Sequence, residues 1–143
     1  MPDLLDANVW VALSVTHHAH HKRAMQFWRE EASGEFAFCR LTELALLRLL
    51  SSRSLLGEDR LDGQASWQAL GDWRSSPVVS YLEEPDGLDE ILGAWGANLN
   101  VRGAHWTDAY LAALATASGY RLVSFDGDFV RYPGLSWLHL KPR

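Results

Sequence analysis

Short apolar runs alternate with segments of helical periodicity along most of the chain, and this alternation limits the possible folds more than any other feature. Each expected strand is brief and is followed by a segment in which apolar residues recur at helical spacing. Strands that alternate with helices predict βαβ units, in which a parallel sheet carries helices on both faces. We expect strands at Leu4-Leu5 and at residues 35–39, 78–82, 121–125 and 135–138.

The expected helices follow residues that can cap them. Asn8 is positioned to cap a helix that comes after a turn at Asp6, and Thr42 to cap a strongly apolar helix. Residues 51–63 and 96–103 are expected to be connections because they are rich in polar residues and glycine. Further helices are expected at residues 18–31, 42–50, 64–73, 86–95 and 107–115.

Size and composition fit a single globular domain that covers residues 1–143. Of the 143 residues, 48% are hydrophobic and 22% are charged, which is usual for globular domains. Cys39 is the only cysteine, so no disulfide can form within the chain and a disulfide scaffold is excluded. We therefore expect the fold to depend on its hydrophobic core.

The N-terminal sequence and the net charge bear on location and partners. The first residues include Asp3 and Asp6 without a basic segment, and no apolar run approaches the roughly 18 residues of a membrane span. We therefore expect a cytoplasmic protein with no membrane partner. The net charge of −5 argues against binding duplex nucleic acid through a bulk positive field, because such affinity comes from Lys and Arg. Nucleic-acid cleavage at a bound metal stays compatible with this charge.

Four carboxylates fall where strands and helices are expected to meet. Asp6 and Asp126 directly follow expected strands. Glu43 lies four residues past Cys39, and Asp108 lies at the start of an expected helix. In open α/β sheets, side chains at the carboxyl ends of the strands can converge although they are far apart in sequence. Each acid alone also has an ordinary explanation, because acids favour the first turn of a helix and Asp-Gly pairs favour turns.

The set of four acids favours a metal site. Two unit charges 4 Å apart repel by about 4 kcal/mol at an effective dielectric constant of 20, so several ionised carboxylates cannot share a pocket without a proton or a cation. Ligation by oxygen alone suits Mg²⁺ or Mn²⁺, and such ions commonly activate water for attack on phosphate esters. The residues thus predict a metal-dependent phosphodiesterase.

Four segments in order also resemble a known family. They are the start LLDANVWVAL, then RLTEL at residues 40–44, WTDAYLAA at 106–113 and LVSFDGDF at 122–129. Together they resemble the PIN domain, specifically the VapC-type toxins of bacterial toxin–antitoxin pairs. The resemblance implies a three-layer α/β/α fold with about five parallel strands and a Mg²⁺- or Mn²⁺-dependent endoribonuclease that inhibits translation. It also implies a homodimer and a cognate VapB-type antitoxin.

The same resemblance assigns roles to individual residues. The family's four acids fall on Asp6, Glu43, Asp108 and Asp126, which are the expected catalytic and metal-binding residues. Asp6 and Asp108 are the expected direct metal ligands, whereas Glu43 and Asp126 would bind directly or through water. Possible supporting residues are Asn8, Thr42 and Asp128.

Other readings stay open. The alternative to an enzyme is a non-catalytic PIN-like module that binds RNA or a partner. The histidine cluster at residues 17–21 suggests a transition-metal site, but a solvated helix start explains it better because no Cys or further His lies nearby in sequence. Arg40 and Arg102 could pair with a substrate phosphate. Apolar faces could form a groove for an antitoxin helix, although core packing competes for the same residues, Trp10, Phe27, Trp28 and Leu47.

Overall fold

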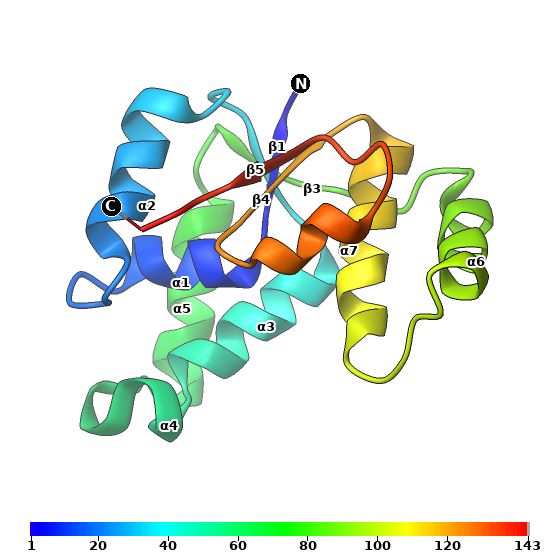
Figure 1. Cartoon of the computed structure of the whole chain (residues 1–143). Helices are drawn as coiled ribbons and strands as arrows, with labels where there is room; N and C mark the ends of the chain where they lie inside the picture. The colour runs from blue at the N-terminus through cyan, green and yellow to red at the C-terminus, as the bar shows by residue number, and fades with distance from the viewer. Residues whose placement is uncertain (143) are drawn as a thin grey trace.

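A computed structural model describes residues 1–142 and shows a central parallel sheet between two layers of helices (Figure 1). The sheet has five strands in the order β3-β2-β1-β4-β5, and every neighbouring pair is parallel. This architecture confirms the predicted three-layer α/β/α class. The strands are β1 (Asp3–Leu5), β2 (Phe36–Phe38), β3 (Val79–Tyr81), β4 (Arg121–Ser124) and β5 (Trp137–His139).

The helices follow the predicted order, with differences in their bounds. The helix expected at 18–31 is a short α-helix that continues as a π-helix, and the connection expected at 51–63 contains two short helical segments. Within residues 1–142, no helix is both long and apolar enough to cross a membrane. The elements are α1 (Ala7–Ser14), α2 (His21–Gln26), η1 (Phe27–Glu31), α3 (Arg40–Leu50), α4 (Arg53–Leu56), η2 (Gly57–Asp59), α5 (Gly63–Arg74), α6 (Leu88–Asn98), α7 (His105–Ser118) and η3 (Gly127–Arg131).

The two predicted helix caps were wrong. Asp6 caps α1, because its side chain accepts a hydrogen bond from the backbone N–H of Ala7, whereas Asn8 lies inside the helix. Helix α3 begins after Cys39, so Thr42 is its third residue. The Thr42 hydroxyl accepts from the backbone N–H of Cys39 at 3.0 Å and thus closes the first turn from within. Both helices start earlier than expected, directly after their strands.

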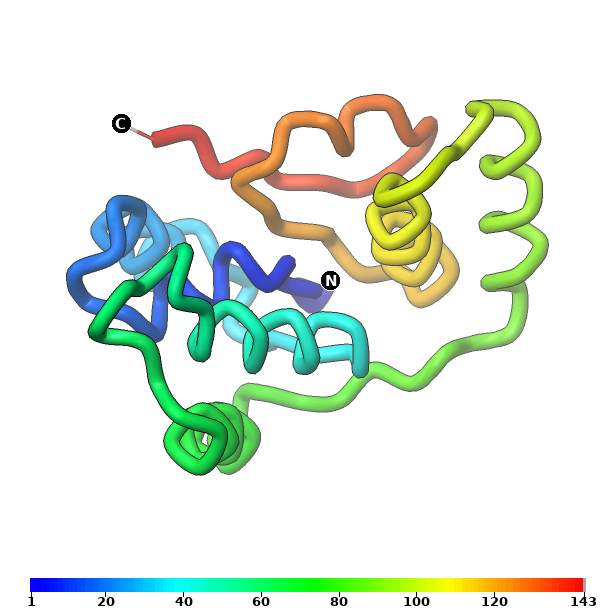
Figure 2. The backbone as a smooth tube through the Cα atoms, turned by 90° about the horizontal axis from the view of Figure 1, so that it is seen from below, coloured from blue at the N-terminus to red at the C-terminus, as the bar shows by residue number. Residues whose placement is uncertain are grey.

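Alternation along the strands divides the core into two parts. In β1, Leu5 packs in one cluster of buried residues and Leu4 in the other. In β4, Val123 and Leu122 divide in the same way. Helices α1 to α5 gather on one side of the sheet, while α6 and α7 lie on the other (Figure 2). Even a strand of three or four residues therefore packs against helices on both faces of the sheet.

The apolar residues considered for an antitoxin groove belong mainly to the core. Trp10 and Phe27 are fully buried. The ring of Trp10 stacks on Phe38, with ring centroids 4.0 Å apart, and the ring of Trp28 stacks on Phe36 at 3.9 Å. Core packing, the competing explanation, therefore accounts for these side chains.

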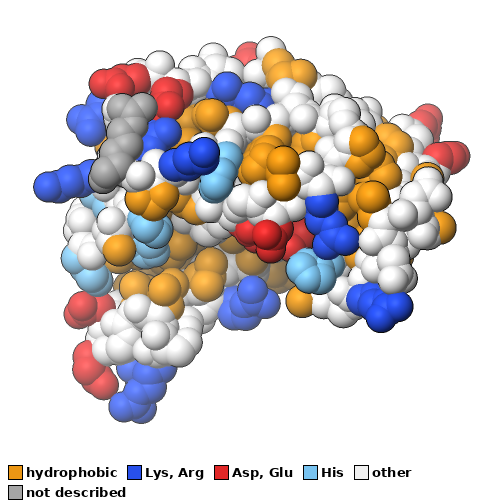
Figure 3. Space-filling view, viewed as in Figure 1, with side chains coloured by type: hydrophobic (Ala, Val, Ile, Leu, Met, Phe, Trp, Pro, Cys, Tyr) orange, Lys and Arg blue, Asp and Glu red, His pale blue; other side chains and the backbone are white. Residues whose placement is uncertain are grey.

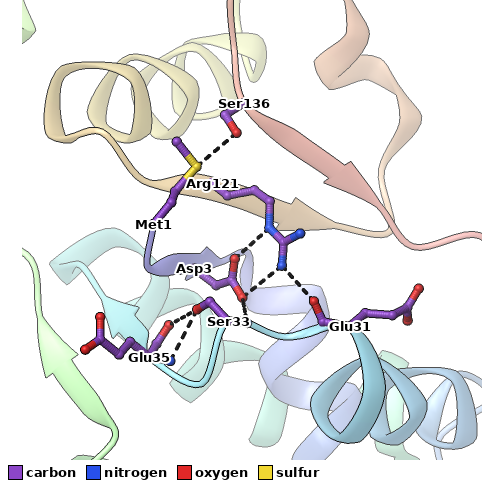
Figure 4. Close-up of polar contacts among 7 residues, drawn as sticks. All are labelled: Met1, Asp3, Glu31, Ser33, Glu35, Arg121 and Ser136. Carbon is purple, nitrogen blue, oxygen red and sulfur yellow. Dashed lines mark hydrogen bonds and ion pairs between the residues drawn. The ribbon is translucent and has the colours of Figure 1, made fainter.

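A buried ion pair fixes the amino-terminal edge of the sheet (Figure 4). Asp3 is fully buried and accepts hydrogen bonds from Arg121 Nε at 2.7 Å and Nη2 at 3.1 Å. Arg121 also donates to the carbonyl oxygen of Glu31, and the backbone N–H of Ser33 donates to Asp3. This network joins β1, β4 and the end of η1 on the side opposite the predicted acidic site.

Candidate functional site

The carboxyl ends of β1 and β4 bring Asp6 and Asp126 together around one buried hydroxyl. The Ser124 hydroxyl donates to Asp6 Oδ2 at 2.7 Å and accepts from the backbone N–H of Asp126 at 3.0 Å. Because β1 and β4 are neighbours in register, with Leu5 opposite Val123, the residues that follow them must meet. Ser124 therefore sets the position of both acids.

Asn8 strengthens the same link. Its Nδ2 donates to Ser124 Oγ at 3.2 Å, and its Oδ1 accepts from the backbone N–H of Phe125 at 3.3 Å. The side chain thus joins the first turn of α1 to the end of β4. Asn8 is therefore bound to the end of β4 from inside α1 and is not a helix cap.

Helix α7 carries the third acid to the same edge. Asp108 lies in the first turn of α7 and, together with Asp6, Asn8 and Thr42, lines a hollow of about 480 Å³. Arg48 of α3 lines this hollow as well. Figure 3 shows a group of acidic side chains near the middle of this face, with basic side chains and a histidine beside it.

Burial and repulsion from neighbouring acids make Asp6 and Asp108 unusually hard to ionise. The pKa of Asp6 is raised from 3.8 to about 6, mainly by burial; the charges of Asp108 and Asp126 contribute to this rise, and the hydrogen bonds from Ser124 and Ala7 oppose it. The pKa of Asp108 is also raised, mainly by burial and then by Asp126. Asp6, Asp108 and Asp126, which come from separate segments, therefore share one electrostatic environment.

The donor set suits a hard divalent ion. Among residues 1–142, no three His, Cys, Asp or Glu side chains lie close enough to form a complete ligand cage. Mg²⁺ does not require such a cage, because it usually keeps several waters and binds one or two carboxylates. Asp6 and Asp108 supply two carboxylates that face one hollow and that repel each other when ionised. The residues present therefore fit Mg²⁺ or Mn²⁺.

Glu43 does not join this group in the structure. Its side chain is only 1% exposed, and Oε2 accepts from Arg74 Nε at 2.7 Å, with Nη2 at 2.6 Å. Arg40 Nη1 lies 3.0 Å from Oε1. The three side chains line a separate hollow of about 400 Å³ beside β3. A buried carboxylate needs a cationic partner, and α5 supplies one in Arg74.

Asp128 and His105 lie at the margin of the acidic site. The backbone N–H of Asp128 donates to Asp126 Oδ1 at 2.9 Å, while the side chain of Asp128 is exposed and raises the pKa of Asp108. His105 Nδ1 lies 3.8 Å from Asp108 Oδ2 and lowers the pKa of Asp108. Both groups thus act on Asp108 through charge.

The histidines at residues 17–21 hold the start of α2 by other contacts. His21 Nδ1 lies 2.7 Å from the carbonyl oxygen of Ala12, and the ring of His20 stacks on Phe125 at 4.8 Å. His18 accepts a hydrogen bond from the backbone N–H of His20. Within residues 1–142, no group of three His, Cys, Asp or Glu side chains that could hold a metal ion includes these histidines.

Sequence reasoning did not single out Ser124. Ser124 is the last residue of a buried strand and lies two residues before an acid. At such a position, the residues of the site are the main hydrogen-bond partners within reach of the hydroxyl. Buried hydroxyls are usually hydrogen-bonded, and this one makes three such contacts, to Asp6, Asn8 and the Asp126 backbone. The Ser-x-Asp spacing at a strand end was the available signal.

The fold and the acidic site together define a PIN domain. The PIN-domain family model matches residues 4–135, and the chain belongs to this family. Its relatives are VapC-type members. The chain is 37% identical over 138 residues to "Ribonuclease VapC41" of Mycobacterium tuberculosis, covering 92% of this chain and 94% of that protein. It is 32% identical to "Ribonuclease VapC39" of the same species, covering 88% and 89%. The chain is thus a VapC-type PIN protein.

Solved structures share the fold. The crystal structure of VapC20 of Mycobacterium tuberculosis, a sarcin–ricin loop cleaving toxin, superposes with a TM-score of 0.68 at 22% identity, over 93% of this chain and 95% of that one. VapBC2 of Rickettsia felis, bound to a promoter DNA fragment, gives a TM-score of 0.71 at 16% identity, over 99% and 100%. At these identities the likeness concerns the fold.

Proposed function

We propose that this protein is a metal-dependent endoribonuclease, the toxin of a VapBC-type toxin–antitoxin pair, which hydrolyses RNA phosphodiester bonds and so inhibits translation. The observation that carries the proposal is the convergence of Asp6, Asp108 and Asp126 at one edge of the sheet, where burial, and then the charges of Asp108 and Asp126, raise the pKa of Asp6 to about 6. Relatives named as VapC ribonucleases cover nearly the entire chain and support the same activity.

The carboxylates are the proposed ligands of Mg²⁺, for which Mn²⁺ can substitute. Asp6 and Asp108 hold the ion, and Asp126 reaches it directly or through water. When bound, the ion activates water and offsets charge on the phosphate. Glu43 is the remaining expected ligand, and for it to reach the same ion its ion pairs with Arg74 and Arg40 must open.

The chain's own residues position these acids. Ser124 fixes Asp6 through the hydrogen bond to Oδ2, and Asn8 fixes Ser124 in turn. The Ser124 hydroxyl and the backbone N–H of Ala7 each occupy one acceptor position of the Asp6 carboxylate, and its remaining lone pairs are available to the hollow that Asp6 lines. One of the acids orients or deprotonates the attacking water, which bonds to phosphorus as the ester P–O bond on the opposite side breaks.

The partners are also part of the proposal. We infer that the protein forms a homodimer in the cytoplasm and is inhibited by a VapB-type antitoxin. Several solved structures with this fold are VapBC complexes, such as VapBC-1 of nontypeable Haemophilus influenzae, which supports the antitoxin. Co-expression with the product of the adjacent small reading frame tests this part. The expected result is a stable complex that lacks nuclease activity, whereas two proteins that purify separately contradict it.

Cleavage of a labelled total-RNA pool tests the activity. Purified protein is incubated with Mg²⁺, Mn²⁺ or EDTA, beside Asp108→Asn and the control Asp59→Asn, an exposed acid on η2. We expect discrete bands with either metal for the parent and the control, and none with EDTA or with Asp108→Asn. Folded protein that leaves every RNA intact contradicts the proposal and favours the non-catalytic binding module.

A further inference from the structure

A second hollow adjoins the acidic one and contains an exposed tryptophan. Trp106 lies two residues before Asp108 in the first turn of α7 and is 45% exposed. The second hollow has a volume of about 460 Å³, within the usual range of ligand sites. Three residues, Leu41, Leu44 and Thr107, line both hollows, so the two are continuous. The remaining lining residues are Arg40, Leu92, Trp106 and Tyr110.

Helix α6 holds the indole of Trp106 in place. A Cβ added at Gly96 would lie 2.5 Å from Cη2 of Trp106, so the ring rests directly against the helix where a side chain is missing. Any larger residue at position 96 would displace the ring. The absence of a side chain at Gly96 therefore fixes an otherwise exposed aromatic group beside the acidic hollow.

The ring of Trp106 differs from that of the other strongly exposed tryptophan. Trp67 is 56% exposed, but the guanidinium of Arg74 covers its ring at 5.3 Å. Within residues 1–142, no aromatic ring or guanidinium stacks on Trp106. An aromatic face that is held in position and left uncovered is what a planar ligand needs.

Cationic groups lie at both hollows. Arg40 is exposed, lies over the ring of Tyr81 at 5.8 Å, pairs with Glu43 and lines the second hollow. Arg48 lines the acidic hollow. Guanidinium groups pair well with phosphate oxygens. The surface thus combines an aromatic face, apolar walls and two cations next to metal-binding carboxylates, which matches the parts of a nucleotide.

We infer that Trp106 is a stacking platform for an unpaired base next to the scissile phosphate. The inference rests on the proposed nuclease function. A phosphodiester placed over Asp6 and Asp108 has its neighbouring base in an adjoining hollow, and this is the hollow that shares three lining residues with theirs. A base within a duplex stays stacked on its neighbours and cannot reach the ring.

Two variants of the platform and one control test the inference. Trp106→Ala removes the ring, and Gly96→Ala keeps it but displaces it. Leu55→Ala, a control on α4, removes an apolar side chain of similar exposure, 41%, that lines neither hollow. Affinity for a labelled single-stranded RNA and for its duplex is measured by fluorescence anisotropy in EDTA, and kcat and KM are measured with Mn²⁺. Thermal unfolding verifies that each variant is folded.

Stacking of one base on an aromatic side chain changes affinity by roughly 5- to 150-fold. We expect Trp106→Ala to weaken single-strand binding and raise KM by about tenfold or more, with Trp106→Phe recovering part of the loss. Gly96→Ala should weaken binding in the same direction without lowering the melting temperature, and Leu55→Ala should match the parent. The duplex should bind weakly to every variant.

The outcomes separate this inference from the proposed function. Parent protein that cleaves RNA, while Trp106→Ala keeps its affinity and KM, overturns the platform and leaves the nuclease standing. If the parent protein neither binds nor cleaves RNA, the proposed function itself is contradicted. Unchanged RNA affinity together with a shift from dimer to monomer in sedimentation also overturns the platform, because the groove would then hold a second copy of the chain.

Discussion

Replacement of Asp6 by asparagine should stabilise the metal-free protein while it removes activity. The rise of the Asp6 pKa from 3.8 to about 6 corresponds to about 3 kcal/mol of destabilisation when the group is ionised. Asparagine removes this charge but keeps only one of the two acceptor oxygens that serve Ala7 and Ser124. Loss of one such hydrogen bond costs about 1–2 kcal/mol, so the net gain should be about 1–2 kcal/mol.

The stability gained by Asp6→Asn should depend on pH. Because the folded-state pKa of Asp6 is raised, the folded protein binds a proton more readily than the unfolded chain, so the destabilisation grows as the pH rises from 3.8 to about 6 and levels off above that value. The advantage of Asp6→Asn should therefore shrink by about 1 kcal/mol between pH 7.5 and pH 5. Urea unfolding in EDTA at both pH values measures the difference in unfolding free energy between Asp6→Asn and the parent, with Asp59→Asn as control. Destabilisation by Asp6→Asn, or a gain that is independent of pH, would refute the reasoning.

The remaining predictions concern the supporting groups and the metal. Ser124→Ala should reduce cleavage and destabilise the fold by about 1–3 kcal/mol, because three hydrogen bonds are lost; cleavage at the parental rate contradicts its positioning role. Arg121→Met should cost about 3–5 kcal/mol in urea unfolding, because the fully buried Asp3 carboxylate loses its counter-ion, and a second change, Asp3→Asn, should recover part of this loss. Mn²⁺ at about 100 times its Kd should stabilise the parent by about 2.7 kcal/mol and leave Asp108→Asn unchanged; equal thermal shifts for both proteins would place the ion elsewhere.

The sheet and the position of three acids could be predicted because short-range rules determine them. Alternating strands and helices define the layers, and Asp6 and Asp126 directly follow strands whose carboxyl ends must share an edge. Asp108 joins them because α7 begins at that edge. These statements depend on the order of elements and not on the detailed packing of side chains.

The position of the Glu43 side chain could not be predicted in the same way. Its contact with Arg74 joins residues 31 positions apart and depends on how α5 packs against α3. Similarly, Asn8 is a residue type that often caps helices. Because α1 begins directly after β1, Asp6 occupies the capping position instead, and the Asn8 side chain contacts Ser124. The contacts of Glu43 and Asn8 both depend on tertiary packing, which local residue propensities do not predict.

Binding of the catalytic ion by the Asp6 and Asp108 carboxylates can be tested through the cleavage reaction. The measurement is the single-turnover cleavage rate of an RNA fragment cut by the parent protein, determined against Mn²⁺ concentration for the parent and for Asp6→Asn. If these carboxylates bind the ion, the rate rises to saturation with Mn²⁺, falls to background in EDTA and stays at background for Asp6→Asn at every concentration. A rate that does not depend on the metal, or an equal rate for Asp6→Asn, would contradict this binding.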